Sequence, residues 1–196
     1  MTGTLTMADV ERLRALATSS EEHVILDMDE DAFHGFYERT ARPLWAYLSR
    51  VAGPAEADDL LQETYYRFLR ARGRYQGEAH RRNALFAIAT NLARDRARRR
   101  RADPVAAARD SADDSTIAAV VVPSPEARHD LSRAMEQMAP RERGLLWLAY
   151  GQGWSHREIA GVLGLSAGSV KPLLFRARRK LASLLQGNTA GKEGAR

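Results

Sequence analysis

The chain has 196 residues, enough for one domain or two small ones, and its 44% of apolar residues suffices for ordinary hydrophobic cores. It contains no cysteine, which excludes disulfides, thiolate metal sites and cysteine nucleophiles. No segment approaches the roughly 18 apolar residues of a membrane span, and the N-terminus lacks a basic-then-apolar secretory pattern, so the sequence predicts a cytoplasmic protein.

The net charge of +5 conceals a segregation of charge along the chain. Residues 32–101 hold 15 basic and seven acidic side chains, and residues 129–196 hold 11 and five. The first 31 residues and the segment 102–128 are acidic. Two basic blocks separated by an acidic spacer predict two nucleic-acid-binding modules on one tether.

Residues 1–30 are predicted to form an acidic, partly disordered leader with one short helix at Ala8–Ala17. A first long helix is expected from Asp31 to Val51. Pro43 is expected to kink or split this helix, because proline removes a backbone donor. The apolar residues of the segment follow helical spacing: Phe33, Phe36, Tyr37, Leu44, Tyr47, Leu48 and Val51.

Gly53 and Pro54 form a strong start signal for a second helix, which is expected to run to about Arg72. Acidic residues follow in its first turns, where the helix dipole favours negative charge. A third helix is expected from about Ala79 to Arg101, with a basic C-terminal end. Three helices around one core predict a compact all-α domain over residues 31–101.

Residues 102–124 lack a sustained amphipathic period and predict an acidic linker. Helix restarts at Ser124-Pro125, and a further helix is expected from Pro140 to Tyr150. The second domain is therefore predicted as a four-helix unit over residues 125–186, followed by a frayed tail, 187–196.

The last two helices of this unit have the pattern of a helix-turn-helix. Ser155 and Glu158 form a capping box, Gly164 supplies a left-handed residue, and Ser166 can cap the longer second helix. One stripe of that helix is apolar and the opposite face is basic, as in helices that enter the DNA major groove. The alternative is that two amphipathic helices simply pack and present a solvated basic face.

Two strings carry a family resemblance. The first runs DDLLQETYYRFLR (58–70), YQGE (75–78) and IATNLAR (88–94), and it resembles region 2 of a bacterial extracytoplasmic-function sigma factor of the sigma-70 family. The second, from Met138 to Lys171 and closed by RARRKL (176–181), resembles region 4 of the same family. Both occur in the family's order, and DDLxQET is specific to it. The resemblance implies an all-α fold of two small helical domains joined by a flexible linker.

In the family, the first string binds a coiled coil in the β′ clamp of RNA polymerase. The matching residues here are Asp58, Asp59, Leu61, Gln62, Glu63 and Arg67, with Leu61 as the expected apolar anchor. The alternative for the carboxylates is that they only complement the helix dipole. A metal site at Asp59 and Glu63 is a weaker rival, since two carboxylates without a histidine make a poor divalent site.

The following helix resembles the element that reads and melts the promoter −10 sequence. Asn91 falls at the position associated with a flipped base, and an amide can hydrogen-bond a base edge. Alternatively Asn91 only faces water. Ala84 and Ala87 stand where the family commonly has Trp and Arg, which makes the surface less aromatic and less basic. The residues expected to hold phosphates are Arg94, Arg96, Arg98 and Arg99.

Region 4 of the family reads the −35 element and contacts the β flap of the polymerase. Pro172 and Leu173 stand where the family usually has Ser and Arg, which predicts a bent recognition helix and an atypical −35 preference. Phe175 could touch a thymine methyl. The candidate −35 residues are Ser166, Ser169, Lys171, Phe175, Arg176 and Arg179.

The resemblance implies a factor that binds core RNA polymerase, recognises promoter DNA, supports strand opening and is controlled by an anti-sigma factor. No cofactor, metal or substrate is expected, and no catalytic constellation is visible. The linker resembles the family's acidic connector, or it only keeps the tether soluble. The alternative functions are a stand-alone helix-turn-helix regulator that binds duplex DNA without polymerase, and a non-specific basic helical protein.

Overall fold

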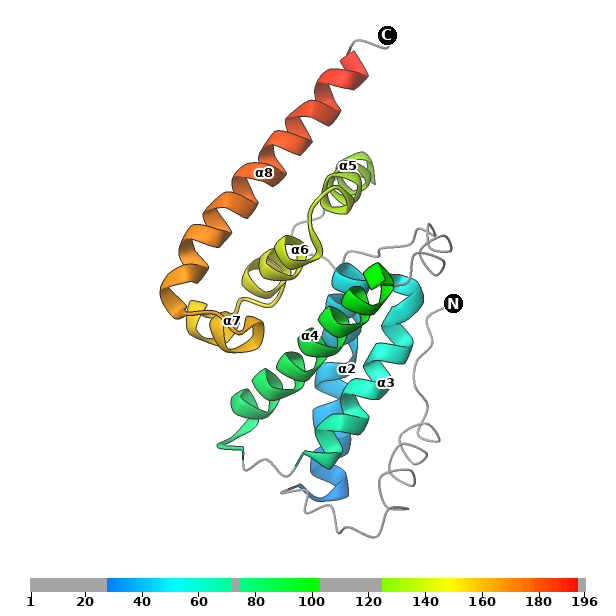
Figure 1. The fold of residues 1–196 in the computed structure, drawn as a ribbon, viewed down its shortest axis with the longest axis vertical. Coiled ribbons are helices and arrows are strands. Elements are labelled where there is room, and N and C mark those ends of the chain that lie inside the picture. The colour runs from blue at the N-terminus through cyan, green and yellow to red at the C-terminus, as the bar shows by residue number, and fades with distance from the viewer. Residues whose placement is uncertain (1–27, 72–74, 103–124, 194–196) are drawn as a thin grey trace. The chain divides into compact units, whose positions relative to one another are not determined.

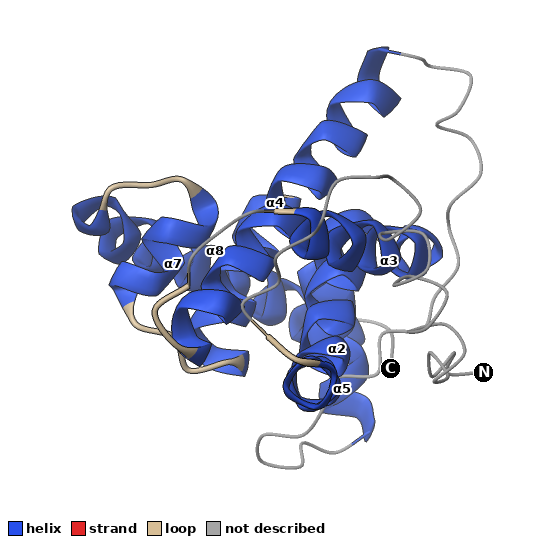
Figure 2. Cartoon of the chain, turned by 90° about the horizontal axis from the view of Figure 1, so that it is seen from below, coloured by secondary structure: helices blue, strands red, loops and turns tan. Residues whose placement is uncertain are grey.

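The computed structural model describes residues 28–71, 75–102 and 125–193 (Figure 1). Within these ranges every regular element is helical, which confirms the predicted all-α class (Figure 2). The described residues form two compact units, one before and one after the segment 103–124. The predicted leader with its short helix, and nearly all of the linker, lie outside the described residues. The exact domain boundaries stay predictions.

The first unit consists of α2 (Glu30–Ala52), α3 (Pro54–Arg70) and α4 (Glu78–Ala102), and each of the three packs against the other two. Asp29 caps α2, because its Oδ1 accepts a 2.8 Å hydrogen bond from the Ala32 N–H. Gly53 has φ 100°, which a residue with a side chain rarely adopts, and Pro54 follows as the first residue of α3. This turn matches the predicted start signal.

The expected split of the first helix at Pro43 does not occur, because α2 continues through this residue. Proline removes one hydrogen bond of the helix, at a cost of about 3 kcal/mol. Leu44, Tyr47 and Leu48 directly after it are almost fully buried, and their packing against α3 and α4 offsets that cost.

Aromatic rings and paired hydroxyls fill the core of the first unit. Phe36 of α2 stacks on Phe68 of α3 with ring centroids 5.4 Å apart. The Tyr65 hydroxyl lies 2.7 Å from Thr40 Oγ1, and the Tyr47 hydroxyl lies 2.8 Å from Thr90 Oγ1. Burial raises the pKa of Tyr47 to about 12, although the hydrogen bond to Thr90 opposes the shift. These contacts satisfy the polar groups that the packing of three helices buries.

The second unit consists of α5 (Pro125–Glu136), α6 (Pro140–Leu146), a π-helical turn η2 (Trp147–Gly151), α7 (His156–Leu163) and α8 (Ala167–Glu193). A single helix was expected from Pro140 to Tyr150, whereas the structure changes to π-helix at Trp147. Gly151 ends this turn, and a Cβ at that position would collide with the Trp147 ring, so the turn has room for the ring only with glycine there.

The helix-turn-helix has the predicted local geometry. Ser155 Oγ accepts from the Glu158 N–H while Glu158 Oε2 accepts from the Ser155 N–H, and Gly164 is left-handed with φ 63° and ψ 45°. α8 passes through Pro172 unbroken, and the bend expected there stays a prediction. The helix also continues beyond Gln186, so the frayed tail expected from residue 187 is wrong as far as Glu193.

Among the described helices, none is by itself long and apolar enough to cross a membrane. α7 and α8 would meet that length and composition only when taken together, and a bend of 94° separates them.

Candidate functional surfaces

The acidic face of α3 carries most of the residues that were expected to bind the β′ clamp of the polymerase. Asp58, Asp59, Gln62 and Arg67 are exposed, and Glu63 is half-buried. Leu61 is only 4% exposed and belongs to the core, so the expectation that it anchors a partner directly is wrong. Leu61 lies on the buried stripe of α3 together with Leu60, Thr64 and Phe68.

Asp58 is held by a residue that the sequence did not single out. Trp45 Nε1 of α2 donates a 2.8 Å hydrogen bond to Asp58 Oδ1. The two residues are 13 positions apart, on either side of the Gly53 turn. The only signal in the sequence was the position of Trp45 at the edge of the apolar stripe of α2.

Glu63 and Arg67 form an ion pair along the helix, with Arg67 Nε 2.6 Å from Glu63 Oε1. This pair cancels two charges of the predicted surface within α3 itself. Asp58 and Asp59 have no ion-pair partner among the described residues, so they carry the net negative charge of this face.

A groove of about 280 Å³ separates α3 from α4. Glu56 lies at one side of it and reaches both Arg96 Nε (3.0 Å) and Arg100 Nη1 (3.1 Å) of α4. The Glu56 side chain is only 12% exposed. From the sequence, Glu56 was expected only to complement the helix dipole of α3. Its ion pairs could not be foreseen, because the two arginines lie 40 and 44 positions away in the chain. Lining the groove are Glu56, Asp59, Leu60, Glu63, Arg67, Leu92, Asp95, Arg96 and Arg99.

The residues expected at the −10 sequence lie on the outer face of α4. Asn91, Arg94, Arg98 and Arg99 are exposed, and Arg98 Nη2 lies 3.1 Å from Asp95 Oδ1. Arg96 is tied to Glu56, but half of its side chain remains exposed (50%). Glu56 of α3 therefore holds the basic C-terminal end of α4 in place, and the outer side of this end is exposed to solvent.

The exposed face of α8 carries the residues expected at the −35 element. Val170, Leu174 and Ala177 are buried against the rest of the unit, whereas Phe175 is 63% exposed. Ser166 Oγ and Ser169 Oγ lie 2.6 Å apart at the start of the helix. Lys171, Arg176 and Arg179 are exposed. A basic helix surface with one large apolar ring can contact both phosphates and base edges.

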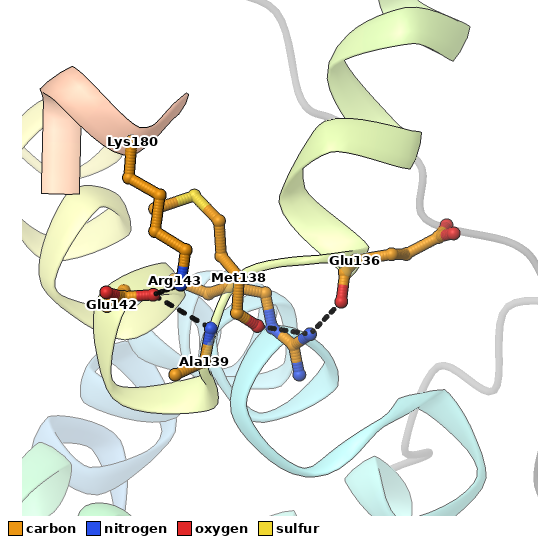
Figure 3. A network of polar contacts seen from close by, with 6 residues as sticks. All are labelled: Glu136, Met138, Ala139, Glu142, Arg143 and Lys180. Atoms are coloured by element: carbon orange, nitrogen blue, oxygen red, sulfur yellow. Dashed lines mark hydrogen bonds and ion pairs between the residues drawn. The ribbon is translucent and has the colours of Figure 1, made fainter. Parts of the chain in front are cut away.

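A polar network fixes α8 to α6 (Figure 3). Glu142 Oε2 accepts hydrogen bonds from Lys180 Nζ (2.7 Å) and from the Ala139 N–H (2.9 Å). Arg143 Nη1 donates to the carbonyl oxygens of Glu136 and Met138, each at 3.3 Å. Burial would raise the pKa of Glu142, but the Lys180 and Ala139 hydrogen bonds and the Lys180 charge outweigh it and lower this pKa.

No three histidine, cysteine or acidic side chains in the described ranges lie together so that they could hold a metal ion. Glu63 of the rival metal pair is engaged by Arg67 instead.

Family models match both units. The model described as Sigma-70 region 2 covers residues 36–102, and the model described as Sigma-70, region 4 covers residues 128–181.

Curated relatives extend over most of the chain. RNA polymerase sigma factor CarQ of Myxococcus xanthus is 34% identical over 160 residues, which cover 81% of this chain and 92% of the relative. ECF RNA polymerase sigma factor SigL of Mycobacterium tuberculosis is 32% identical over 76% of this chain and 86% of its own length. ECF RNA polymerase sigma factor BldN of Streptomyces coelicolor is 30% identical, and the match spans 61% of its length.

Two solved structures share the fold. The sigma factor RpoE, in complex with the anti-sigma factor NepR from Bartonella quintana, has a TM-score of 0.61 at 21% identity, over 79% of this chain and 96% of that one. CnrH, in complex with the cytosolic domain of CnrY, has a TM-score of 0.52 at 26% identity, over 90% and 96%.

Proposed function

The chain belongs to the extracytoplasmic-function group of the sigma-70 family, and we propose how its two units divide the work of a promoter-specific sigma factor. The observation that carries the proposal is that region 2 and region 4 occur in order on one chain, each as a helical unit with its own exposed charged face. The first unit docks on core RNA polymerase and engages the −10 sequence, and the second engages the −35 element.

The docking surface consists of Asp58, Asp59 and Gln62, flanked by the Glu63–Arg67 pair. Exposed carboxylates and an amide fit arginine side chains of a partner, because guanidinium groups bind carboxylates through two parallel hydrogen bonds. The internal pair at Glu63 and Arg67 leaves the two aspartates as the charged contacts. The partner segment is the coiled coil of the polymerase β′ clamp.

The −10 surface consists of Asn91 with Arg94, Arg96, Arg98 and Arg99 on α4. The asparagine is exposed and its amide can bind a flipped base, while the arginines hold phosphates of the opened strand. Arg96 does so from a position that Glu56 fixes.

The −35 surface is the outer face of α8, with Ser166, Ser169, Lys171, Phe175, Arg176 and Arg179. Basic side chains supply affinity through phosphates, and the ends of α8 side chains reach base edges in the major groove. The second unit also contacts the β flap.

The chain is expected to act in the cytoplasm and to have no catalytic activity of its own, because the polymerase supplies the chemistry. An anti-sigma factor is a further expected partner, since the structural relative RpoE is in complex with one. A stand-alone regulator is not favoured, because such a protein would not need a region 2 unit.

The central test reverses one charge of the docking surface. Asp59→Arg should abolish binding to core RNA polymerase, because it places a cation opposite the arginines expected on the partner. Binding is measured by co-purification with core enzyme and by run-off transcription. Glu38→Arg is the matched control, since it makes the same change of charge on an exposed residue of the first unit outside the proposed docking surface. Retained polymerase binding by Asp59→Arg would overturn the assigned surface.

A further inference from the structure

Trp45 is half-buried and lies on α2, whereas all residues of the proposed docking surface lie on α3. Its indole ring sits at the border of the core, and its Nε1–H points at the exposed Asp58 of α3, 2.8 Å from Oδ1. The Gly53 turn, with its left-handed backbone, brings the two helices into this arrangement.

The chemistry of this contact differs from that of the neighbouring ion pair. Arg67 neutralises the carboxylate of Glu63. An indole N–H is a neutral donor, so it fixes the orientation of Asp58 while leaving its negative charge in place. A carboxylate offers about four lone-pair positions, and the indole occupies one on Oδ1. The other oxygen remains available to a guanidinium group.

We propose that Trp45 is a positioning residue of the polymerase-docking surface, whose indole N–H holds the Asp58 carboxylate in the orientation that an arginine of the partner binds. The inference rests on the proposed function of α3. An exposed aspartate rotates freely about two bonds, and fixing it before binding lowers the entropy lost on association. The docking surface thereby extends from α3 to α2.

A double-mutant cycle on the full-length chain tests the inference. Trp45→Phe keeps a ring in place and removes the N–H donor, and Asp58→Ala removes the acceptor. We expect Trp45→Phe to weaken the equilibrium affinity for core RNA polymerase roughly 3- to 10-fold. Asp58→Ala should weaken it more, and the double variant should be no weaker than Asp58→Ala alone, because the indole acts through the carboxylate.

A spectroscopic measurement checks the contact itself. In a ¹H–¹⁵N spectrum, one of the three tryptophan indole N–H signals should move in Asp58→Ala. The same signal should stay nearer its original position in Asp58→Asn, which keeps an oxygen acceptor but loses the charge. If no indole signal responds to Asp58→Ala, the contact does not exist in solution and the inference is wrong.

The outcomes separate the inference from the proposed function. Unchanged affinity of Trp45→Phe, with weakened binding by Asp58→Ala, overturns the inference and leaves the docking surface intact. An equal loss from Trp45→Phe in both backgrounds also overturns it, because Trp45 would then act independently of Asp58. If neither Asp58→Ala nor Asp59→Arg weakens binding, the docking surface itself is wrong. Should Trp45→Phe fail to fold in a denaturation assay, Trp45→Leu serves as the second donorless variant.

Discussion

At the scale of single residues, the charge that the first unit presents depends on which of its acidic and basic side chains form ion pairs with each other. Glu56 binds two arginines, and Glu63 binds a third. The exposed pair of Glu63 and Arg67 contributes little to stability, typically below about 1 kcal/mol. Its main effect is to leave Asp58 and Asp59 as the charged side chains of α3 that a partner can bind.

Gly151 allows the sharpest prediction at this scale. Gly151→Ala should lower the free energy of unfolding of the second unit by about 1–3 kcal/mol, because the new Cβ would collide with the Trp147 ring. The effect is measured by thermal or chemical denaturation followed through tryptophan fluorescence.

Gly161→Ala is the matched control for that substitution. Gly161 lies inside α7, and a Cβ there would meet no atom within 4 Å. Alanine should therefore stabilise the helix by about 0.5–1 kcal/mol. Equal destabilisation by both substitutions would contradict the role assigned to the Trp147 ring.

The residue-scale features that could be predicted from the sequence are those that depend on residues close by in the chain. The Ser155–Glu158 capping box and the left-handed Gly164 follow from residue types within one or two helical turns. The Trp45–Asp58 and Glu56–Arg96 contacts join residues 13 and 40 positions apart. Such contacts depend on how the helices pack, which residue spacing along the chain does not specify.

At the scale of elements, the helices tolerate residues that local preference disfavours. Pro43 and Pro172 lie inside continuous helices. Pro43 was expected to kink or split its helix, and no split occurs because the packing of the turns on either side offsets the lost hydrogen bond. The single helix expected from Pro140 to Tyr150 is wrong at Trp147, where a π-helical turn begins.

The link between α6 and α8 predicts a dependence on pH. The pKa of Glu142 lies below the ordinary value of 4.5, so its contribution to stability is present above that pH and is lost as the pH falls through the lower folded-state value. We expect the free energy of unfolding of the second unit to fall as the pH decreases below the ordinary pKa value of 4.5.

Glu142→Gln should flatten this dependence, as measured by urea denaturation at several pH values. Lys180→Met should flatten it partly, because the Ala139 hydrogen bond remains. If Lys180→Met had the same slope as the unmodified chain, Lys180 would not be a cause of the lowered pKa.

At the scale of the whole molecule, the two proposed DNA-binding faces belong to two separately packed units. Each proposed face is small and would hold DNA largely through basic side chains, so each alone should bind weakly and in a salt-dependent manner. Joining them on one polymerase makes the second contact effectively intramolecular.

The expected consequence is avidity for promoters that contain both elements. The reconstituted holoenzyme should bind such DNA roughly 100-fold or more tightly than DNA with only a −10 or only a −35 element, at one fixed salt concentration. Competition binding with matched duplexes measures the ratio. Equal affinity for DNA with and without the −35 element would show that the outer face of α8 makes no contribution.

The double contact of Glu56 also constrains protein engineering. A chimera that takes α4 from a relative, in order to change promoter choice, replaces Arg96 and Arg100 and leaves the Glu56 carboxylate without both partners unless the new helix has arginines there. Without them the basic end of the new helix would lose the contacts that hold it against α3. A transplanted α4 should therefore keep arginines at positions 96 and 100 for Glu56 of α3, and a threonine at position 90 for Tyr47 of α2.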